Sequence, residues 1–476
     1  MKNALRGVRV VVAVVLALVA GCASPPHAPG PAKMGAWAYV VDPPVAPSHV
    51  LRVEATFGAT RELTSADEAR GRVKGLEQRT PGGWRAAEPT SAGWTLSDCV
   101  EPCVVRYTID LAELARECGQ HLDCAWQKGD ATLGSVGKWL VVPRDDGDAA
   151  VTLRVRAREG ASFALGPRKA SGDASTYAFR ASELREGSYG AFGPMRVTRI
   201  ARVGASVDVA QLGTMTAMND ADVTTWVSEA TSLIEGFYGR FPVDATVFLV
   251  PLPGGTELQF GSVLALSGAS VVILAGEGLP LAKTHEEWVL VHELFHLGTP
   301  TFWGEGRWLE EGLATYYEPV LRARAGWISE ADLWAHFAEQ MPRGVRDPES
   351  APSMEDRRDI DSTYWGGALF VLLADVRIRA RTAGVHSFDD VLRAVLARGG
   401  DVTHVWKVAD VLRVGDEVTG TRVLAELYRG FVLGGEAVDL EAELAALGVV
   451  RGPKGAVLRE DRPRSNLRRA ITRGGK

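Results

Sequence analysis

The distribution of apolar residues divides the chain into a first part with strand-like alternation and a second part with helical spacing. Between residues 35 and 196, short runs rich in β-branched residues predict strands, several of which alternate apolar and polar positions. Because glycine, proline and aspartate separate these runs, we expect a β-sandwich-like domain over 35–196. Segment 110–127 has a more helical pattern and is expected to be an insertion in this domain. The predicted strands are 49–57, 104–111, 138–143, 149–157 and 195–203.

The second part, residues 197–450, combines two predicted strands with many predicted helices. An acidic start followed by helical periodicity predicts a helix over 220–241, and apolar runs at 245–252 and 269–276 predict strands. The pattern therefore predicts an α+β fold with several domains. A basic tail over 451–476 is expected to be solvated, with contact to anionic lipid as the alternative. The other predicted helices are 284–298, 307–326, 330–341, 364–382, 387–399, 421–432 and 439–448.

The first residues have the pattern of an export signal. A positively charged start is followed by an apolar stretch over 10–20, which has the length of a signal-peptide core. The letters LVAGC, which end at Cys22, resemble a bacterial lipoprotein signal in which the cysteine becomes the lipidated first residue. We therefore predict a signal peptide over 1–21, lipidation of Cys22 and a proline-rich tether over 22–34. A plain signal peptide cut nearby is the alternative. Either signal places the protein outside the cytoplasm, and the lipid would anchor it in the cell envelope.

Composition and cysteine placement agree with an exported, folded protein. The chain has 476 residues, of which 46% are hydrophobic, and a net charge of −6, so it lacks the basic character of a nucleic-acid binder. No apolar run is long enough to span a bilayer. Apart from Cys22, the cysteines are Cys99, Cys103, Cys118 and Cys124. In an exported protein they predict two disulfides, whose pairing the sequence leaves open, and a four-cysteine zinc site is the alternative.

Residues 288–300, WVLVHELFHLGTP, are the strongest candidate for chemistry. His292 and His296 are four residues apart and so lie on one face of a helix, where two imidazole nitrogens can reach one zinc ion. Glu293 points to the side, where it can reach a water without being a ligand. Apolar residues fill the rest of this helix and predict that it lies in the core. The alternative is a chance occurrence in a buried helix, which predicts no third ligand downstream.

A third ligand is offered by RWLEEGLATYYEP, residues 307–319. Its pattern W-L-x-E-G-x-A-x-Y-x-E, downstream of HExxH, resembles gluzincin zinc metallopeptidases of the aminopeptidase N and glycyl aminopeptidase families. By this resemblance Glu311 is the third zinc ligand and Glu310 is not a ligand. Glu318 matches a second acid of the motif, which we expect to orient a ligating histidine, with a surface charge as the alternative. The 14 residues between the second histidine and Glu311 are fewer than usual in these families, and Glu305 is the alternative ligand.

A second resemblance to the glycyl aminopeptidase family covers residues 361–396. It implies that Tyr364 supports the oxyanion of the tetrahedral intermediate, a role that a phenol can fill as a preorganised donor. An ordinary aromatic residue at a helix start is the alternative. The resemblance as a whole covers about 197–450 and implies a thermolysin-like, mostly helical catalytic domain. Over the preceding β-rich domain it is only architectural.

These features together predict a lipid-anchored peptidase with one Zn²⁺ that hydrolyses peptides or proteins, with Glu293 as the base. A purely structural metal would not require Glu293. Exopeptidases of the resembling families bind the free amine of the substrate with an acid, for which Glu257 is a candidate; without it, an endopeptidase or an unusual exopeptidase is favoured. The alternative function is a non-catalytic envelope lipoprotein that uses a peptidase fold to bind protein. The presence of all three ligands and the base argues against it.

Overall fold

The computed structural model describes residues 36–144, 147–170, 173–184, 187–345, 353–356, 359–452 and 455–474. The chain divides into two units, Met1–Met34 and Gly35–Lys476, and all described residues belong to the second. The predicted signal peptide, the lipidated Cys22 and the tether lie outside the described residues. In the part of the chain that the structure describes, no helix has the length and apolar character needed to cross a membrane.

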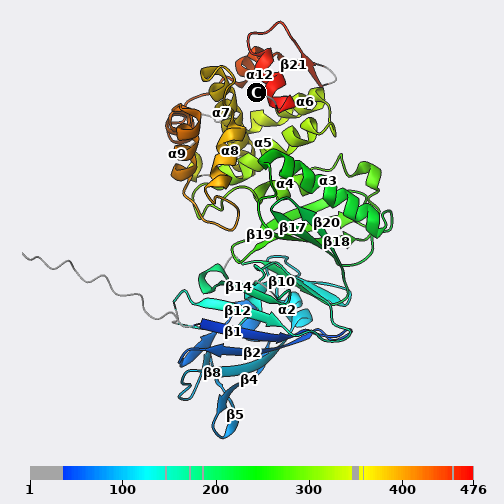
Figure 1. Ribbon diagram of the computed structural model, residues 1–476, viewed down its shortest axis with the longest axis vertical. Coiled ribbons are helices and arrows are strands. Elements are labelled where there is room, and N and C mark those ends of the chain that lie inside the picture. Colours follow the sequence, from blue (N-terminus) through cyan, green and yellow to red (C-terminus); the bar gives the residue numbers. More distant parts are fainter. Residues whose placement is uncertain are drawn as a thin grey trace, which may run out of the picture. The chain divides into compact units, whose positions relative to one another are not determined.

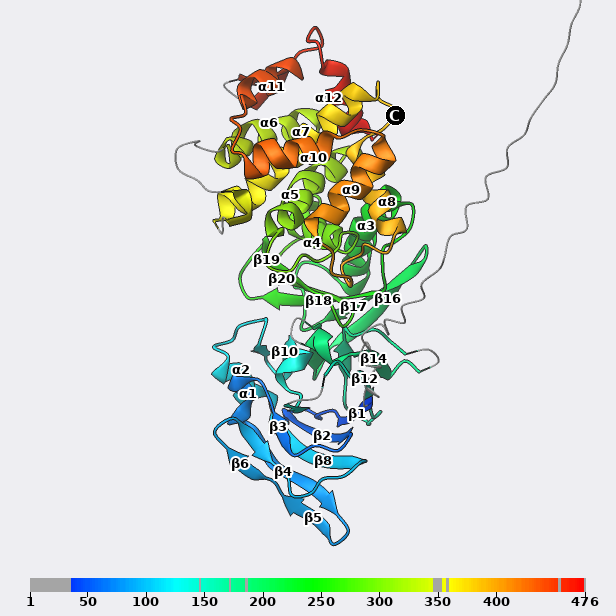
Figure 2. The ribbon, with the colours of Figure 1, turned by 90° about the vertical axis from the view of Figure 1, so that its left-hand side faces the viewer.

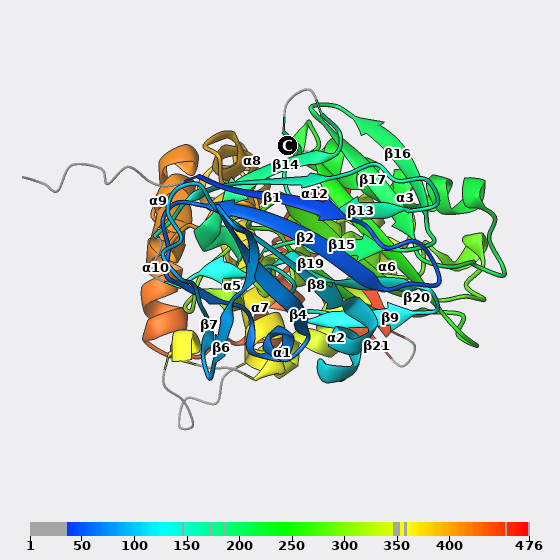
Figure 3. The ribbon, with the colours of Figure 1, turned by 90° about the horizontal axis from the view of Figure 1, so that it is seen from below.

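A seven-stranded sheet forms one layer of the N-terminal part (Figure 3). Its strands alternate between buried and more exposed positions: in β2, the residues Leu51, Val53, Ala55 and Phe57 are buried and those between them are not. The inward side chains share a core with side chains of two smaller sheets, among them Trp94. The strand order is β14 (Thr176–Arg180), β12 (Ala150–Val155), β1 (Ala36–Asp42), β2 (Val50–Phe57), β8 (Cys103–Asp110), β4 (Val73–Thr80), β5 (Gly83–Ala86).

Two four-stranded sheets complete this part and confirm the prediction of a β-rich, sandwich-like region. The predicted strand over 138–143 is shorter in the structure. A 3₁₀ turn, Val136–Lys138, occupies its start, and only Val142–Pro143 forms a strand, β11. The short helices are α1 (Asp67–Arg70) and α2 (Leu111–Glu117). One sheet has the order β13 (Phe163–Leu165), β15 (Tyr189–Phe192), β10 (Ala131–Ser135), β9 (Ala125–Lys128), and the other β11 (Val142–Pro143), β3 (Glu62–Thr64), β7 (Gly93–Thr95), β6 (Glu88–Thr90).

Both predicted disulfides are present in this region. Cys99 pairs with Cys103, the first residue of β8, and Cys118 pairs with Cys124 in the loop between α2 and β9. The four sulfur atoms are therefore consumed by disulfides, and the alternative of a four-cysteine zinc site is excluded.

A five-stranded sheet follows (Figure 1, Figure 2), and its central strands are buried on both faces. Val247 and Leu249 of its strand β18 belong to a core shared with the helices, whereas Phe248 and Val250 belong to a core shared with β10 and β15. This double burial explains why the predicted strands 245–252 and 269–276, now β18 and β20, are continuous apolar runs. The order is β16 (Arg196–Arg202), β17 (Ala205–Gln211), β18 (Ala245–Leu252), β20 (Ala269–Gly276), β19 (Leu258–Leu264), with β19 antiparallel at the edge.

The remaining described residues are mostly helical, as predicted. The helix predicted from residue 220 is α3, which starts after a capping box between Asn219 and Asp222 and ends before Gly239, which has a positive φ. The helices are α3 (Asp220–Tyr238), α4 (Val289–His296), α5 (Arg307–Arg324), α6 (Glu330–Gln340), α7 (Gly367–Arg381), α8 (Phe388–Ala397), α9 (Val408–Thr419), α10 (Val423–Leu427), α11 (Leu440–Ala446) and α12 (Ser465–Arg473); π-helical turns span Asp361–Gly366 and Tyr428–Leu433.

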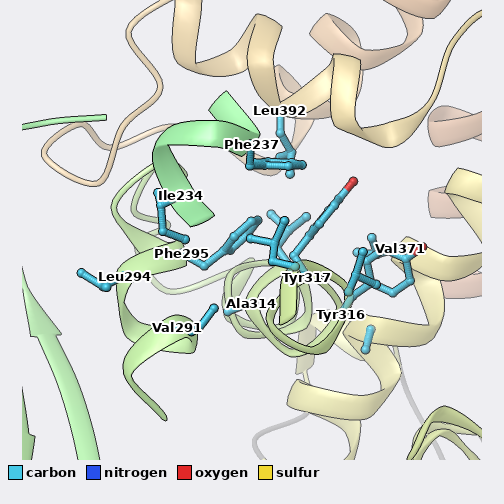
Figure 4. Close-up of a cluster of buried hydrophobic side chains, with 14 of the residues drawn as sticks. Ile234, Phe237, Val291, Leu294, Phe295, Ala314, Tyr316, Tyr317, Val371 and Leu392 are labelled. Atoms are coloured by element: carbon cyan, nitrogen blue, oxygen red, sulfur yellow. The ribbon is translucent and has the colours of Figure 1, made fainter. Parts of the chain in front are cut away.

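Three aromatic rings fix α4 between its neighbours (Figure 4). Phe295 of α4 lies 5.8 Å from Phe237 of α3 and 5.1 Å from Tyr317 of α5, measured between ring centroids. Phe237 and Tyr317 are themselves 4.9 Å apart. Because such contacts are directional and all three rings are buried, they hold α4 in one rotation about its axis. This matters because Phe295 directly precedes His296.

The C-terminal segment corrects the expectation of a solvated tail. β21 (Val449–Gly452) pairs with β22 (Gly455–Leu458), and α12 buries Leu467 and Ile471 in the core. Arg468 is fully buried and bonds the carboxylates of Glu330 and Glu460 and the carbonyl of Leu447. The basic residues of this segment therefore include a structural ion pair, and the alternative of contact between exposed basic residues and anionic lipid stays a prediction.

Candidate metal centre

Helix α4 carries the two histidines on one face, as the spacing predicted. Their side chains are almost completely buried, with 3% of His292 and 6% of His296 exposed, and their rings meet edge to face with centroids 5.0 Å apart. The apolar residues of α4 are buried on its other sides. The helix is thus a core element with a polar face, which is what a rigid ligand platform requires.

Glu311 of α5 completes a group of three possible ligands. Its Oε2 lies 3.4 Å from Nε2 of His292 and 3.6 Å from Nε2 of His296, and the three ligand atoms lie within 4.8 Å of one another. Ligands that bind zinc at about 2.0–2.1 Å in a tetrahedron are about 3.4 Å apart, so the two distances from Glu311 match those between ligands of one zinc ion. Glu305, the alternative ligand, is exposed and lies outside this group.

The charges of the three residues are strongly coupled. Burial lowers the pKa of His292. Burial also acts to lower the pKa of His296, but the hydrogen bond and charge of Glu311 outweigh it and raise this pKa to about 9. Burial acts to raise the pKa of Glu311, but the bonds from both histidines hold it well below its usual range. Without a cation the group thus retains a proton, which a metal ion must displace, so metal affinity is expected to fall with falling pH.

Glu293 lies beside this group without belonging to it. Burial, followed by the charge of Glu311, raises the pKa of Glu293 to about 7. Strand β19 passes so close that a Cβ on Gly261 would lie 2.5 Å from Cγ of Glu293. Glycine at this position therefore makes room for the Glu293 side chain. A carboxyl with a pKa near neutrality, next to a possible metal site, can both accept and release a proton.

A cavity of about 450 Å³ opens at this group, a volume typical of small-ligand sites. Its walls come from β19 and the residues after it, the end of α4, loop 301–304 and the start of α5. The charged residues on the wall are Asp123, Glu293, His296, Arg307, Glu310 and Glu311.

Tyr364 also lines this cavity, from the π-helical turn Asp361–Gly366. Its ring stacks on that of His292, with an angle of 13° between the planes and centroids 6.1 Å apart. Burial, and then the charge and hydrogen bond of Glu311, raise the pKa of Tyr364, so its hydroxyl stays protonated at neutral pH. The structure thus brings Tyr364 to the metal group, and its role toward an oxyanion stays a prediction.

Glu318 does not make the contact that we expected. Its Oε1 accepts a hydrogen bond from Arg322 at 2.5 Å, and Arg322 also donates to the carbonyls of His285 and Glu286, just before α4. Nδ1 of His296 is buried and, among the described residues, has no hydrogen-bond partner. The predicted contact with a ligating histidine is therefore replaced by a buried ion pair, and the alternative of a surface charge is wrong as well. The pair holds the segment that leads into the candidate metal helix.

We expect Glu318→Ala to lower the free energy of unfolding by about 3 kcal/mol, because it leaves the Arg322 guanidinium buried without its carboxylate. Urea unfolding of the single variants and of the double variant with Arg322→Ala measures the coupling. The control is Glu417→Ala, which breaks exposed pairs with Arg413, at the same spacing, and with Arg398, and should cost much less than Glu318→Ala because water already solvates these charges. If Glu318→Ala and Glu417→Ala lowered the free energy of unfolding equally, the buried pair would not stabilise the segment before α4.

The acid that the sequence suggested for amine binding lies outside the cavity, and the cavity wall holds charged residues to which the sequence assigned no role. Glu257 is exposed and is not part of the cavity wall. Glu310, expected not to be a ligand, lies outside the metal group. It accepts a hydrogen bond from the backbone of Phe302. Burial, and to a smaller extent the charge of Glu311, raise the pKa of Glu310 to about 7. Asp123 reaches the cavity from the loop that Cys118–Cys124 closes, and only its place among the cysteines could have drawn attention to it.

Comparison with known proteins supports the fold. No family model and no curated protein matches the sequence. An aminopeptidase N family protein from Idiomarina loihiensis superposes with a TM-score of 0.65 over 87% of this chain and 78% of its own, at 16% identity. A variant of an M1 zinc metallopeptidase from Deinococcus radiodurans, bound to a Tyr-Ser-Ala substrate, superposes with a TM-score of 0.50. The match covers 86% of this chain and 96% of that protein, also at 16% identity. The chain therefore has the multidomain α+β fold of the M1 zinc metallopeptidases and aminopeptidase N proteins.

Proposed function

We propose that this protein is an exported, lipid-anchored zinc peptidase that hydrolyses peptide bonds with an activated water. The observation that carries the proposal is the convergence of His292, His296 and Glu311 beside Glu293 at the wall of a cavity. Structures of similar fold are described as zinc metallopeptidases, one of them bound to a tripeptide, which supports a peptide substrate. Lipid anchoring rests on the sequence around Cys22. Export rests on the same sequence and agrees with the two disulfides.

Zinc is the metal that the donor set fits. Two imidazoles and one carboxylate leave a fourth tetrahedral position open, which is the arrangement of catalytic rather than structural zinc sites. His292, His296 and Glu311 would hold the ion. When bound, a zinc ion polarises the scissile carbonyl and lowers the pKa of a water.

The other residues of the site supply positions for protons and for the peptide. Glu293 takes a proton from the attacking water and passes it to the leaving amine. Tyr364 donates a hydrogen bond to the oxygen that becomes negative during the attack. Among the described strands, β19 lies at the edge of its sheet, so one row of its backbone groups has no neighbouring strand there and can bind an extended peptide.

The proposal is tested by digesting a mixed peptide library with the chain from residue 24 onward. We expect about one bound zinc per chain and new peptide termini, whose positions distinguish an endopeptidase from an aminopeptidase. Removal of the zinc with a chelator should stop cleavage, and added zinc should restore it. A protein that takes up zinc but leaves every peptide intact would instead favour the non-catalytic, protein-binding alternative.

The pH dependence of cleavage should follow the ionisation of Glu293. Its pKa, about 7 without metal, moves lower when a cation is bound, and only the ionised carboxylate can accept a proton. The value of kcat/KM should therefore fall as the pH drops from 7 to 5. Measuring the profile at saturating zinc separates this effect from metal loss. A profile that stays flat over this range would argue against Glu293 as the base.

A further inference from the structure

Arg307 is the only lysine or arginine among the described residues that line the cavity. Four carboxylates share the wall with it, so most of the wall repels anions. The imidazole of His296 adds no lasting positive charge, because it must be neutral to bind a metal ion. The described wall thus has one place, at the start of α5, where a negatively charged group of a ligand meets a permanent positive charge.

The backbone that leads into Arg307 is held in one conformation. Gly306, the residue before it, has a φ of 97°, and a Cβ on this glycine would lie 2.5 Å from Cγ2 of Val408. Its N–H donates a hydrogen bond to Oε2 of Glu355 at 3.0 Å. Oε1 of Glu355 in turn accepts a hydrogen bond from the hydroxyl of Tyr428, 3.1 Å away. The Arg307 side chain therefore starts from a fixed point, the first residue of α5.

The guanidinium group of Arg307 is open to a ligand. The side chain is 65% exposed and, within the described residues, forms no hydrogen bond. Its ion pair there is long, with Nε 3.8 Å from Oε1 of Glu311. The carboxylate of Asp123, also on the wall, accepts a hydrogen bond from the Tyr189 hydroxyl at 2.7 Å instead. The donors of the guanidinium group are therefore available to a carboxylate that enters the cavity.

The two carboxylate oxygens of Glu311 have different neighbours. Oε2 is the oxygen near the two imidazoles, whereas Oε1 is the one 3.8 Å from Arg307. A metal ion at the proposed site would offset the charge of Glu311 and leave Arg307 without an ionic partner. Arg307 also lies near Tyr364, since burial raises the pKa of Tyr364 and the charge of Arg307 opposes this rise. A group bound by Arg307 would thus lie beside the residues proposed to hold zinc and the oxyanion.

We propose that Arg307 is a specificity-determining residue that binds a carboxylate group of the peptide. The proposal rests on the peptidase function proposed above. The planar guanidinium group can donate two parallel hydrogen bonds to one carboxylate, which the ammonium group of lysine cannot do. Peptides carry carboxylates at two kinds of position, the free C-terminus and the side chains of aspartate and glutamate. The peptide panel below distinguishes these two sources.

The test uses five tripeptides, a neutral parent and four relatives that each add one carboxylate. The parent is a C-terminal amide of asparagine residues; one relative has a free C-terminus, and three have aspartate at the first, second or third position. For the wild-type chain we expect kcat/KM to be about tenfold higher for the peptide with the recognised carboxylate than for the parent. Arg307→Gln should bring this ratio close to one, mainly through KM. A wild-type chain without any such preference overturns the proposal, as does a preference that Arg307→Gln leaves unchanged.

A conservative variant and a matched control accompany Arg307→Gln. Arg307→Lys keeps the charge but loses the planar fork, so its ratio should lie between those of the wild-type chain and Arg307→Gln. The control is Arg413→Gln, which removes an exposed arginine of α9 that does not line the cavity. It should keep the wild-type ratio. If Arg413→Gln lowered the ratio as much as Arg307→Gln, the preference would follow the net charge of the chain and the proposal would fail.

Zinc content separates peptide binding from an effect of Arg307 on Glu311. Arg307→Gln should bind zinc as tightly as the wild-type chain, measured by competition with a chromogenic chelator. A loss of zinc affinity, together with an equal fall of kcat/KM for all five peptides, would make Arg307 a support for Glu311 and overturn the proposal.

A binding measurement separates this inference from the proposed function. Calorimetric titration of the five peptides into the zinc-loaded Glu293→Gln chain reports affinity without cleavage. Selective binding that an added Arg307→Gln abolishes supports the inference even if the wild-type chain cleaves nothing, in which case the peptidase function alone fails. Cleavage of all five peptides at one rate, with equal binding, leaves the peptidase function standing and overturns the role of Arg307.

Discussion

Glu293→Gln is expected to lower kcat by about 10²–10⁴-fold, the usual contribution of a general base. The amide has nearly the shape of the carboxylate but cannot accept the proton of the attacking water. Because Glu293 lies outside the group of three ligands, zinc content should stay the same as in the wild-type chain. The measurement combines steady-state kinetics on a cleaved peptide with metal analysis of the same sample.

The matched control for this substitution is Glu286→Gln, an exposed glutamate on the segment before α4. It makes the same chemical change next to the same helix and should retain wild-type kcat. If Glu293→Gln kept more than about a tenth of the activity, the proton would have to move through another group, contrary to the mechanism proposed above.

Glu311→Gln is expected to abolish stable zinc binding, whereas Glu310→Gln should retain it. The two glutamates are neighbours on α5, but only Glu311 lies 3.4 and 3.6 Å from the histidine nitrogens. Removing a residue that only orients a ligand weakens metal affinity by ~10–100-fold. Removing a ligand itself should weaken zinc affinity by more than this. Competition with a chromogenic chelator measures both dissociation constants. Equal zinc loss in the two variants would mean that the local fold, and not ligation, was damaged.

Short-range patterns predicted the elements around the site well. The spacing of His292 and His296, the apolar filling of α4 and the two central strands all depend on neighbours within one element, and the structure has them as predicted. The partner of Glu318 was missed although its signal was local, since Arg322 follows four residues later on the same helix. The same holds for α12, where Leu467 and Ile471 recur at helical spacing within the basic segment.

Long-range contacts were predicted only where a family resemblance pointed to them, as for Glu311 and Tyr364, because local patterns carry no information about distant partners. Tyr364 reaches the metal group because α5 and α7 approach so closely that a Cβ on Gly312 would lie 2.4 Å from the backbone of Gly367. Asp123 and Tyr189 are 66 residues apart, and no periodicity links them. Strand β19 is partly exposed at a sheet edge and lacks the apolar run that marked β18 and β20.

The two-sided burial of the central strands of the five-stranded sheet ties the half of the chain that carries the histidines to the half that precedes it. A fragment that began near residue 197 would expose Phe248, Val250 and Val272 to water, an apolar surface that invites aggregation. The β-rich half therefore covers an apolar surface of the half that carries the histidines. If the chain is an exported peptidase as proposed, proteolytic loss of the leading half would inactivate it rather than release an active core.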